Sequence, residues 1–343
     1  MRKLVLLAVS VLALVALGRP ATALAYGAQG HEVVGAIADN LLRPAARARV
    51  RALLGMPLRA ASTWADCVKD VMPVAGQGMR YNPDPRFRAA CRRFDTPAGR
   101  ARMQAYVARN WDRCAADSHD QACHKTYHYT DVAIQHDRYD RAHAGTSDHD
   151  IVAAMAAAID VLQGRPAPGP VAIQNPTEAL LLLAHLVGDV HQPLHVGSVY
   201  LDDEGRLVDP GPSGGPIDRH IDTRGGNAIE DGNTNLHAQW DAIPRSIDPA
   251  VLPAAMLKAA RAIPPTPGPV AQWPARWASS TMLVAREAFA GLSFTRVGAA
   301  RPGNWVVTLH DRPAYEATRA TLQQRQLTLA GARLAQVLNA LWP

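Results

Sequence analysis

The segment LLLLAHLVGDVHQPLH, residues 180–195, constrains this chain more than any other stretch of its sequence. His185 and Asp189 stand four residues apart in an apolar helical run, so their side chains project from one helix face on successive turns. A solvated His/Asp pair, the usual meaning of this spacing, fits poorly here because unpaired polar groups are costly in apolar surroundings. The segment therefore predicts a helix that offers two ligands to one cation.

Capping and breaking residues mark the two ends of this helix. Asn175 and Pro176 form a strong helix start, with Asn175 as the N-cap and Pro176 at the first helical position. Pro193 should kink or end the helix at its other end. His195, the next candidate ligand, would therefore face a neighbouring position rather than the same helix face.

Helical signals also dominate the rest of the chain. Residues 29–42, 151–162 and 314–341 repeat apolar residues at helical spacing, whereas alternating strand patterns are few. With 48% hydrophobic and 19% charged residues, the chain can bury a sizeable core. We therefore expect a mainly α fold, in which residues 72–120 and 202–235 are loop insertions with short helices.

The first 25 residues are typical of a secretory signal peptide. A basic start precedes an apolar run (4–17), and small residues stand at the −3 and −1 positions of a cleavage site after Ala25. An uncleaved anchor helix is the alternative, but the run is shorter than the ~20 residues that span a bilayer. We expect a mature domain of residues 26–343 that begins at Tyr26 and is secreted or periplasmic.

Export would change the net charge of the mature chain and would allow its cysteines to form disulfides. Loss of the signal peptide removes three basic residues and lowers the formal net charge from +6 to +3, so bulk charge does not identify a partner. An oxidising compartment favours disulfides, and four cysteines allow three pairings, among which the sequence does not choose. The four are Cys67, Cys91, Cys114 and Cys123.

Histidine and aspartate recur at ligand spacing elsewhere in the chain. His237 and Asp241 in LHAQWD repeat the four-residue spacing. A dispersed set comprises Asp66 in STWAD, His128 in YHYTD and His31 in YGAQGH. Imidazole and carboxylate groups are typical zinc ligands, whereas haem attachment would require a CxxCH motif that the chain lacks. Several such sets in one exported chain predict a metal cluster.

The ordered set YGAQGH, STWAD, HYTD, HLVGDVHQPLH, GGN and LHAQWD resembles the secreted single-strand-specific zinc nucleases of fungi and plants, the S-one/P-one type. That family shares a superfamily with zinc-dependent phospholipase C. The tail QLTLAGARLAQVLNAL is similar to the family's last helix, so the resemblance runs from Tyr26 to the C-terminus. It implies a single helical zinc-cluster domain with long loop insertions.

The resemblance further implies three zinc ions in one cluster. The first would be held by Asp66, His128, His185 and Asp189, and the second by His195, His237 and Asp241. The third would be held by His31, the bridging carboxylate of Asp189, and the main-chain amino group and carbonyl oxygen of Tyr26. Signal cleavage would then create a metal ligand, because the amide nitrogen of an unprocessed chain is a poor one.

The same resemblance assigns roles to four residues beside the cluster. Zinc-activated water would attack phosphorus in line and release 5′-phosphorylated nucleotides. Asp131 would orient that water, Lys69 would stabilise charge on the phosphate, and Asn227 of GGN would help to hold the substrate. Tyr129 matches an aromatic that stacks a nucleobase, an interaction that tolerates any base. Each also has a purely structural interpretation: Asp131 and Asn227 as turn or capping residues, Lys69 as a solvated helix lysine and Tyr129 as a core tyrosine.

Three departures from the family pattern concern this chain in particular. Tyr26 replaces the usual Trp at the mature N-terminus, which should not affect metal binding through main-chain atoms. The stretch between Asp66 and His128 is much longer than in the fungal enzymes, and the segment between His195 and Gly225 is also expanded. Because the additional residues lie beside the cleft, the substrate preference is left open.

These features predict a zinc-dependent endonuclease that hydrolyses RNA and single-stranded DNA as a monomer without a stable protein partner. A 3′-nucleotidase activity is left open. A phospholipase C is the alternative, and it would be indicated by apolar side chains around the cleft and by the lack of an aromatic base slot. A non-enzymatic zinc-sequestering protein is a third hypothesis, although no predicted ligand is missing.

Overall fold

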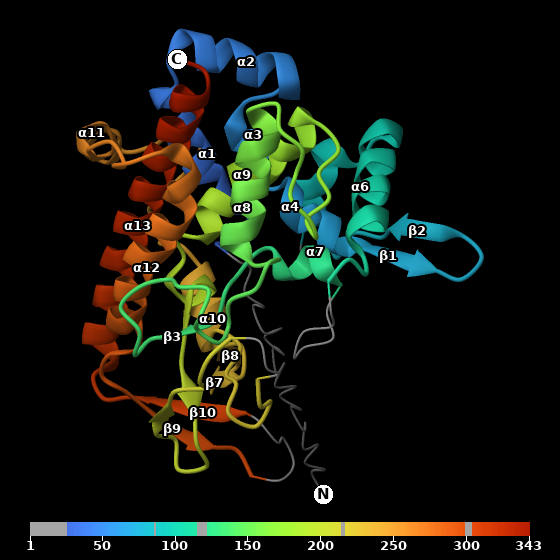
Figure 1. Ribbon diagram of the computed structural model, residues 1–343. Coiled ribbons are helices and arrows are strands. Elements are labelled where there is room, and N and C mark those ends of the chain that lie inside the picture. The colour runs from blue at the N-terminus through green and yellow to red at the C-terminus, as the bar shows by residue number, and fades with distance from the viewer. Residues whose placement is uncertain (1–25, 86, 115–121, 214–216, 299–303) are drawn as a thin grey trace, which may run out of the picture.

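The computed structural model describes residues 26–343 except 86, 115–121, 214–216 and 299–303, so the predicted signal peptide lies outside the described residues. The predicted mainly α class is confirmed (Figure 1). The longer helices are α1 (Gly27–Leu41), α2 (Pro44–Leu54), α6 (Pro97–Asn110), α8 (Ile151–Leu162), α9 (Pro176–Asp189), α11 (Ala254–Ala262), α12 (Trp273–Phe289) and α13 (Arg312–Leu341). The shorter ones are α3 (Leu58–Ala61), α4 (Trp64–Cys67), α5 (Arg88–Cys91), α7 (Cys123–Thr126) and α10 (Leu236–Asp241), with 3₁₀ turns η1 (Val68–Asp70), η2 (Arg92–Phe94), η3 (Pro193–His195) and η4 (Val270–Gln272).

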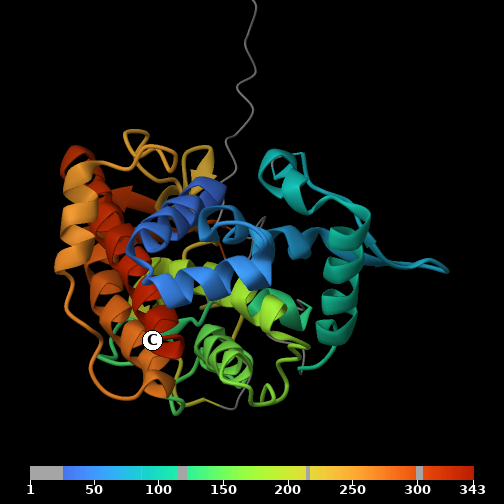
Figure 2. The same ribbon diagram turned by 90° about the horizontal axis from the view of Figure 1, so that it is seen from above.

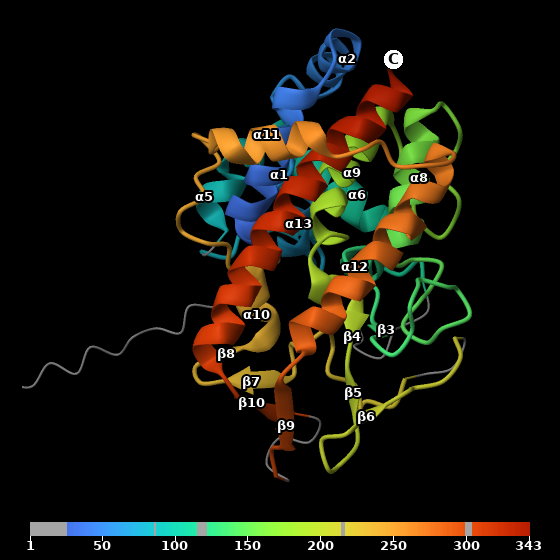
Figure 3. The same cartoon turned by 90° about the vertical axis from the view of Figure 1, so that its left-hand side faces the viewer.

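Helix α13 organises the core by packing on both α1 and α9. It runs from beside the sheet at one end of the domain to the C-terminus near α2 (Figure 3). Close approach to α1 requires a glycine, because a Cβ at Gly331 would lie 2.4 Å from Ile37 Cβ. Gly35 likewise allows α1 to approach α3 closely, because a Cβ at Gly35 would lie 2.6 Å from Leu58 O. These contacts fix α1, which carries the first candidate ligand, against the core.

The apolar helix that the sequence predicted is α9. Asn175 caps it by accepting a hydrogen bond from Glu178 N at 3.0 Å, and Pro176 occupies its first position, as predicted. The helix ends at Asp189, and a 3₁₀ turn follows at Pro193. Its residues from 178 to 189 are all buried, so the polar groups near its C-terminal end lie inside the protein.

The first insertion is more regular than the sequence predicted. Residues 72–120 contain most of a hairpin, β1 (Val71–Val74) with β2 (Gly78–Tyr81), which projects from the body of the domain (Figures 1 and 2). They also contain the 14-residue helix α6, where loops with short helices were expected. The helix buries few apolar side chains and is rich in arginine, so its apolar periodicity is weak.

The second insertion contributes to a sheet that was not predicted. Strands β7 (Ile229–Asp231) and β8 (Thr234–Asn235) join β10 (Trp305–Leu309) and β9 (Leu292–Arg296) in the order β8-β7-β10-β9, with β7 and β10 parallel. Shorter pairs are β3 (Val132–Ala133) with β4 (Gly197–Ser198), and β5 (Tyr200–Leu201) with β6 (Leu207–Val208). Strands of two to five residues show too little alternation to be recognised, and their pairing depends on residues distant in sequence.

The two disulfides tie the first insertion to the segments that carry candidate ligands. Cys67 pairs with Cys91, and Cys114 pairs with Cys123, which resolves the choice among three pairings. Cys67 follows Asp66 directly, whereas Cys123 begins the short helix before His128. These disulfides suit an oxidising, secretory route. Within the described residues, none of the helices has the length and apolarity needed to cross a bilayer.

Candidate metal centre

Three groups of buried or half-buried side chains converge near the C-terminal end of α9. Within each group the ligand atoms lie within 4.8 Å of one another. The groups are His31, His185 and Asp189; Asp66, His128 and His185; and His195, His237 and Asp241. The structure thus brings together all the histidines and aspartates that the sequence predicted as zinc ligands.

The convergence depends on the tertiary fold, because the ligands come from distant segments. Helix α9 supplies two of them, and the others come from α1, α4, the segment after α7, the turn η3 and α10. Helix α10 begins with an Asn235 cap that accepts a hydrogen bond from Ala238 N at 2.8 Å, which places His237 and Asp241 one turn apart. Four-residue spacing therefore places two ligands on α9 and two on α10, and the packing of the helices brings the two pairs together.

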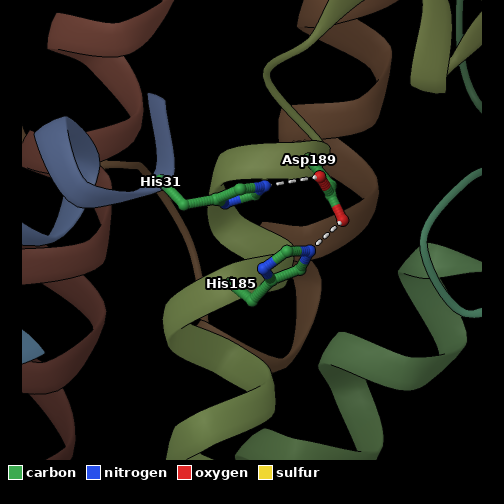
Figure 4. Close-up of side chains that lie close together, drawn as sticks. All are labelled: His31, His185 and Asp189. Atoms are coloured by element: carbon green, nitrogen blue, oxygen red, sulfur yellow. Dashed lines mark ion pairs between the residues drawn. The ribbon is translucent and has the colours of Figure 1, made fainter. Parts of the chain in front are cut away.

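Asp189 lies at the centre of the cluster and is fully buried. Its Oδ2 atom is 2.9 Å from both His128 Nδ1 and His185 Nε2, whereas its Oδ1 atom is 3.3 Å from His31 Nε2. Figure 4 shows the carboxylate beside the stacked rings of His31 and His185, with one oxygen facing each ring. Each oxygen thus faces different histidines, which is the arrangement a bridging carboxylate needs.

The imidazole rings are oriented by backbone carbonyl groups. The Nδ1 atoms of His185, His195 and His237 lie 2.7, 2.8 and 2.7 Å from carbonyl oxygens. Because a carbonyl oxygen only accepts, Nδ1 donates, and the form of each ring that binds a metal presents the lone pair of Nε2 to the site. Metal-bound histidines are commonly oriented by such contacts.

Two observations indicate that cations fit among these groups. The Nε2 atoms of His195 and His237 lie 3.2 Å apart, and two lone pairs at that distance repel each other unless a cation or a proton lies between them. In addition, both ring nitrogens of His31, Asp66 Oδ2 and Asp189 Oδ1 are buried without a hydrogen-bond partner. Such atoms are costly unless something binds them, so the donor set fits a metal cluster.

Electrostatics favour the metal-binding protonation states of two ligands, His128 and Asp189. Burial, reinforced by the charge of Lys69, lowers the pKa of His128 to about 3, so its ring is neutral. Burial alone would raise the pKa of Asp189, but the facing His185 and His195 lower it well below its usual value. A neutral imidazole and an ionised carboxylate are the forms that metal binding requires.

The predicted mature N-terminus lies beside the group formed by His195, His237 and Asp241. The main-chain nitrogen of Tyr26 is 3.2 Å from Asp241 Oδ1, and the phenol donates to His191 O at 3.1 Å. Gln192 donates to the same Asp241 oxygen at 2.7 Å. Gln192 stands inside the HQPLH motif, but its residue type and spacing carry no signal for a contact with Asp241.

A cavity of about 490 Å³ opens beside the ligands. All four residues that the sequence predicted to bind the substrate or to orient the attacking water line this cavity. Its lining comprises Lys69, Lys125, His128, Tyr129, Asp131, Leu194, His195, Arg224, Asn227, Asn235 and His237.

The four predicted residues are held in different ways. Lys69 Nζ forms an ion pair with Asp66 Oδ1 at 2.8 Å, and Asp131 is buried with its backbone oxygen bonded to a tyrosine hydroxyl at 2.5 Å. Asn227 is exposed, and its side-chain nitrogen donates to Arg224 O at 3.0 Å, so it also stabilises its own turn. Tyr129 is half-buried at the cavity wall.

Comparison with protein families bears directly on this site. The model of the S1/P1 Nuclease family matches residues 26–343, which contain all the candidate ligands and the whole cavity lining. The chain belongs to the S1/P1 nuclease family.

Two curated plant relatives of this S1/P1 chain come from Arabidopsis thaliana. Endonuclease 4 is 27% identical over 223 residues, which cover 64% of this chain and 55% of the relative. Endonuclease 2 is 41% identical over 68 residues, or 20% of this chain and 17% of that protein. The chain therefore matches about half the length of the first relative and less of the second.

Proposed function

We propose that this S1/P1 family member is a zinc-dependent endonuclease that hydrolyses RNA and single-stranded DNA to 5′-phosphorylated products. The observation that carries the proposal is one cavity lined by the candidate ligands His128, His195 and His237, by Asp131 and by the half-buried ring of Tyr129. The name of the relative Endonuclease 4 supports cleavage within a nucleic-acid chain. The disulfides support a secreted or periplasmic location, and we propose that the protein acts as a monomer.

Three zinc ions are proposed to occupy the ligand groups. One set is Asp66, His128, His185 and Asp189, a second is His195, His237 and Asp241, and a third is His31, Asp189 and the main chain of Tyr26. When bound, the ions would lower the pKa of water and stabilise charge on the phosphate. Removal of residues 1–25 would convert the Tyr26 amide, beside Asp241 at 3.2 Å, into an amine that can ligate.

The chain's own residues are proposed to orient the reactants. Asp131 would accept a hydrogen bond from the attacking water and hold its proton, since its buried carboxylate lines the cavity. Backbone contacts hold its loop, and Gly225 leaves room for its carboxylate, since a Cβ there would lie 3.1 Å from Asp131 Oδ1. Lys69 would balance charge on the phosphate, and Asn227 would bind the substrate from the turn that carries it.

The cavity lining favours a nucleic acid over a phospholipid. Among the described residues that line it, Leu194 is the one aliphatic side chain, and three are lysine or arginine. Acyl chains would find little apolar surface there, whereas a base can stack on Tyr129 and phosphates can meet the cations. The apolar cleft that would have indicated a phospholipase C is therefore not what lines this cavity.

Tyr129→Ala is expected to raise KM for single-stranded DNA by about 5- to 100-fold, because base stacking on an aromatic contributes ~1–3 kcal/mol. Hydrolysis of bis(4-nitrophenyl) phosphate, which has no base, should change much less. Steady-state kinetics on both substrates test the prediction, with Tyr129→Phe as the control that keeps the ring. Equal losses on both substrates would contradict a stacking role.

The substrate class is tested by incubating the processed, zinc-loaded protein separately with RNA, single-stranded DNA, duplex DNA and phosphatidylcholine. The proposal expects the two single-stranded polymers to be cut fastest, with a phosphate on the 5′ end of each product. Release of phosphorylcholine without cleavage of either nucleic acid would overturn it. A 3′-mononucleotide in the same series shows whether the enzyme also acts as a 3′-nucleotidase.

A further inference from the structure

Two cationic side chains in the cavity were given no individual role in the function proposed above. Lys125 and Arg224 both line it, and neither forms an ion pair with any residue that the structure describes. Lysine is rare in this chain, and two of the three lysines in the described ranges, Lys69 and Lys125, line this cavity. Lys69 is paired with Asp66, so Lys125 and Arg224 are the cations left to meet a ligand.

Lys125 is a half-buried cation that forms no ion pair within the described residues, although the negative charge of Asp70 acts on it at longer range. Its Nζ atom lies 3.9 Å from Met72 Sδ, which is a weak acceptor. Burial lowers the pKa of Lys125, and the positive charge of Lys69 lowers it further. Holding two lysines on one cavity costs free energy in the empty site, and a bound anion would recover it.

The position of Lys125 is fixed by the end of the first insertion. It lies on α7, which begins at Cys123, and the disulfide from Cys123 to Cys114 anchors this short helix. Cys123 N also donates to Trp111 O at 3.0 Å. The end of the lengthened segment between Asp66 and His128 therefore places the Lys125 side chain at the cavity, three residues before the candidate ligand His128.

Arg224 is held in a backbone conformation that few side chains adopt. Its φ is +54°, in the left-handed region, and its N donates to Asp222 Oδ1 at 2.8 Å. Its carbonyl oxygen accepts from both the main chain and the side chain of Asn227, each at 3.0 Å. Non-glycine residues at positive φ are costly and concentrate at functional sites.

We propose that Lys125 and Arg224 form a phosphate-binding subsite for the phosphates next to the scissile one in a single-stranded polynucleotide. The proposal rests on the nuclease function above and extends it from one phosphodiester to a chain of them. Phosphates recur along a strand, so cations from separate segments that line one cavity can bind neighbouring phosphates. The subsite would favour polynucleotides over dinucleotides, which carry only the phosphate that is cut.

The test compares kcat/KM for Lys125→Gln, Arg224→Asn and the wild type on a 12-nucleotide DNA and on a dinucleotide, over a range of salt concentrations. Asparagine tolerates positive φ, so Arg224→Asn removes the guanidinium without adding backbone strain. Lys258→Gln, on the exposed face of α11, is the charge-matched control. Melting temperatures and zinc content verify that each variant is folded and loaded.

Each cavity variant should lower kcat/KM on the 12-nucleotide DNA by about tenfold, as expected for loss of a charge-assisted hydrogen bond, with a smaller loss on the dinucleotide. The slope of log kcat/KM against log salt should become less steep by about 0.7 per cation removed, whereas Lys258→Gln should behave as the wild type. Equal losses on both substrates, or an unchanged salt slope, would overturn the subsite while leaving the nuclease function intact. A wild type inactive on nucleic acid would overturn both.

Discussion

Asp189→Asn is expected to lower nuclease activity on the order of 10³-fold, because several kcal/mol of charge stabilisation depend on metal ions that this carboxylate would bridge. Its two oxygens face different histidines, with Oδ2 2.9 Å from His185 and Oδ1 3.3 Å from His31. An amide has one oxygen and no charge, so it cannot replace both contacts. The zinc content of the variant should fall together with its activity.

The measurement pairs kcat on single-stranded DNA with metal analysis of the same preparation. Asp137→Asn, an exposed aspartate outside the three ligand groups, is the matched control and should match the wild type in both. A variant with full zinc content and activity near that of the wild type would show that Asp189 does not bridge the ions.

Asp131→Asn is expected to separate chemistry from metal binding. Asp131 lies outside the three ligand groups, so the variant should keep its full zinc content. Its turnover should nevertheless fall about 10²- to 10⁴-fold, because a neutral amide cannot hold the proton of the attacking water. The buried position of Asp131 at the cavity wall underlies this expectation.

Measurements of kcat, KM and zinc content decide the role of Asp131. The expected pattern is a lowered kcat with KM and zinc content close to those of the wild type. Loss of zinc would instead make Asp131 a ligand, and an unchanged kcat would make it an ordinary structural residue of its loop.

Short-range patterns in the sequence predicted the centre of this protein well. The cap at Asn175, the run of apolar residues and the break at Pro193 specify α9 locally, and four-residue spacing places His185 and Asp189 on one face. The convergence of α1, α4 and α10 on that face required the family resemblance, because helical periodicity does not specify which helices meet.

The parts that escaped prediction depend on contacts between distant residues. The sheet is completed by parallel pairing of Trp305 with Ile229, and the disulfide pairs depend on how the first insertion folds back on the domain. Lys125 and Arg224 carry no spacing pattern, and their shared role becomes apparent only when the fold places them around one cavity.

The central claim is that the three ligand groups hold a zinc cluster completed by the main chain of Tyr26. The most direct test is the number of zinc ions per chain, measured by elemental analysis on protein whose N-terminus is verified as Tyr26. The account predicts three ions per processed chain, with the third lost first when residues 1–25 remain attached. One zinc ion or none per correctly processed chain would contradict it.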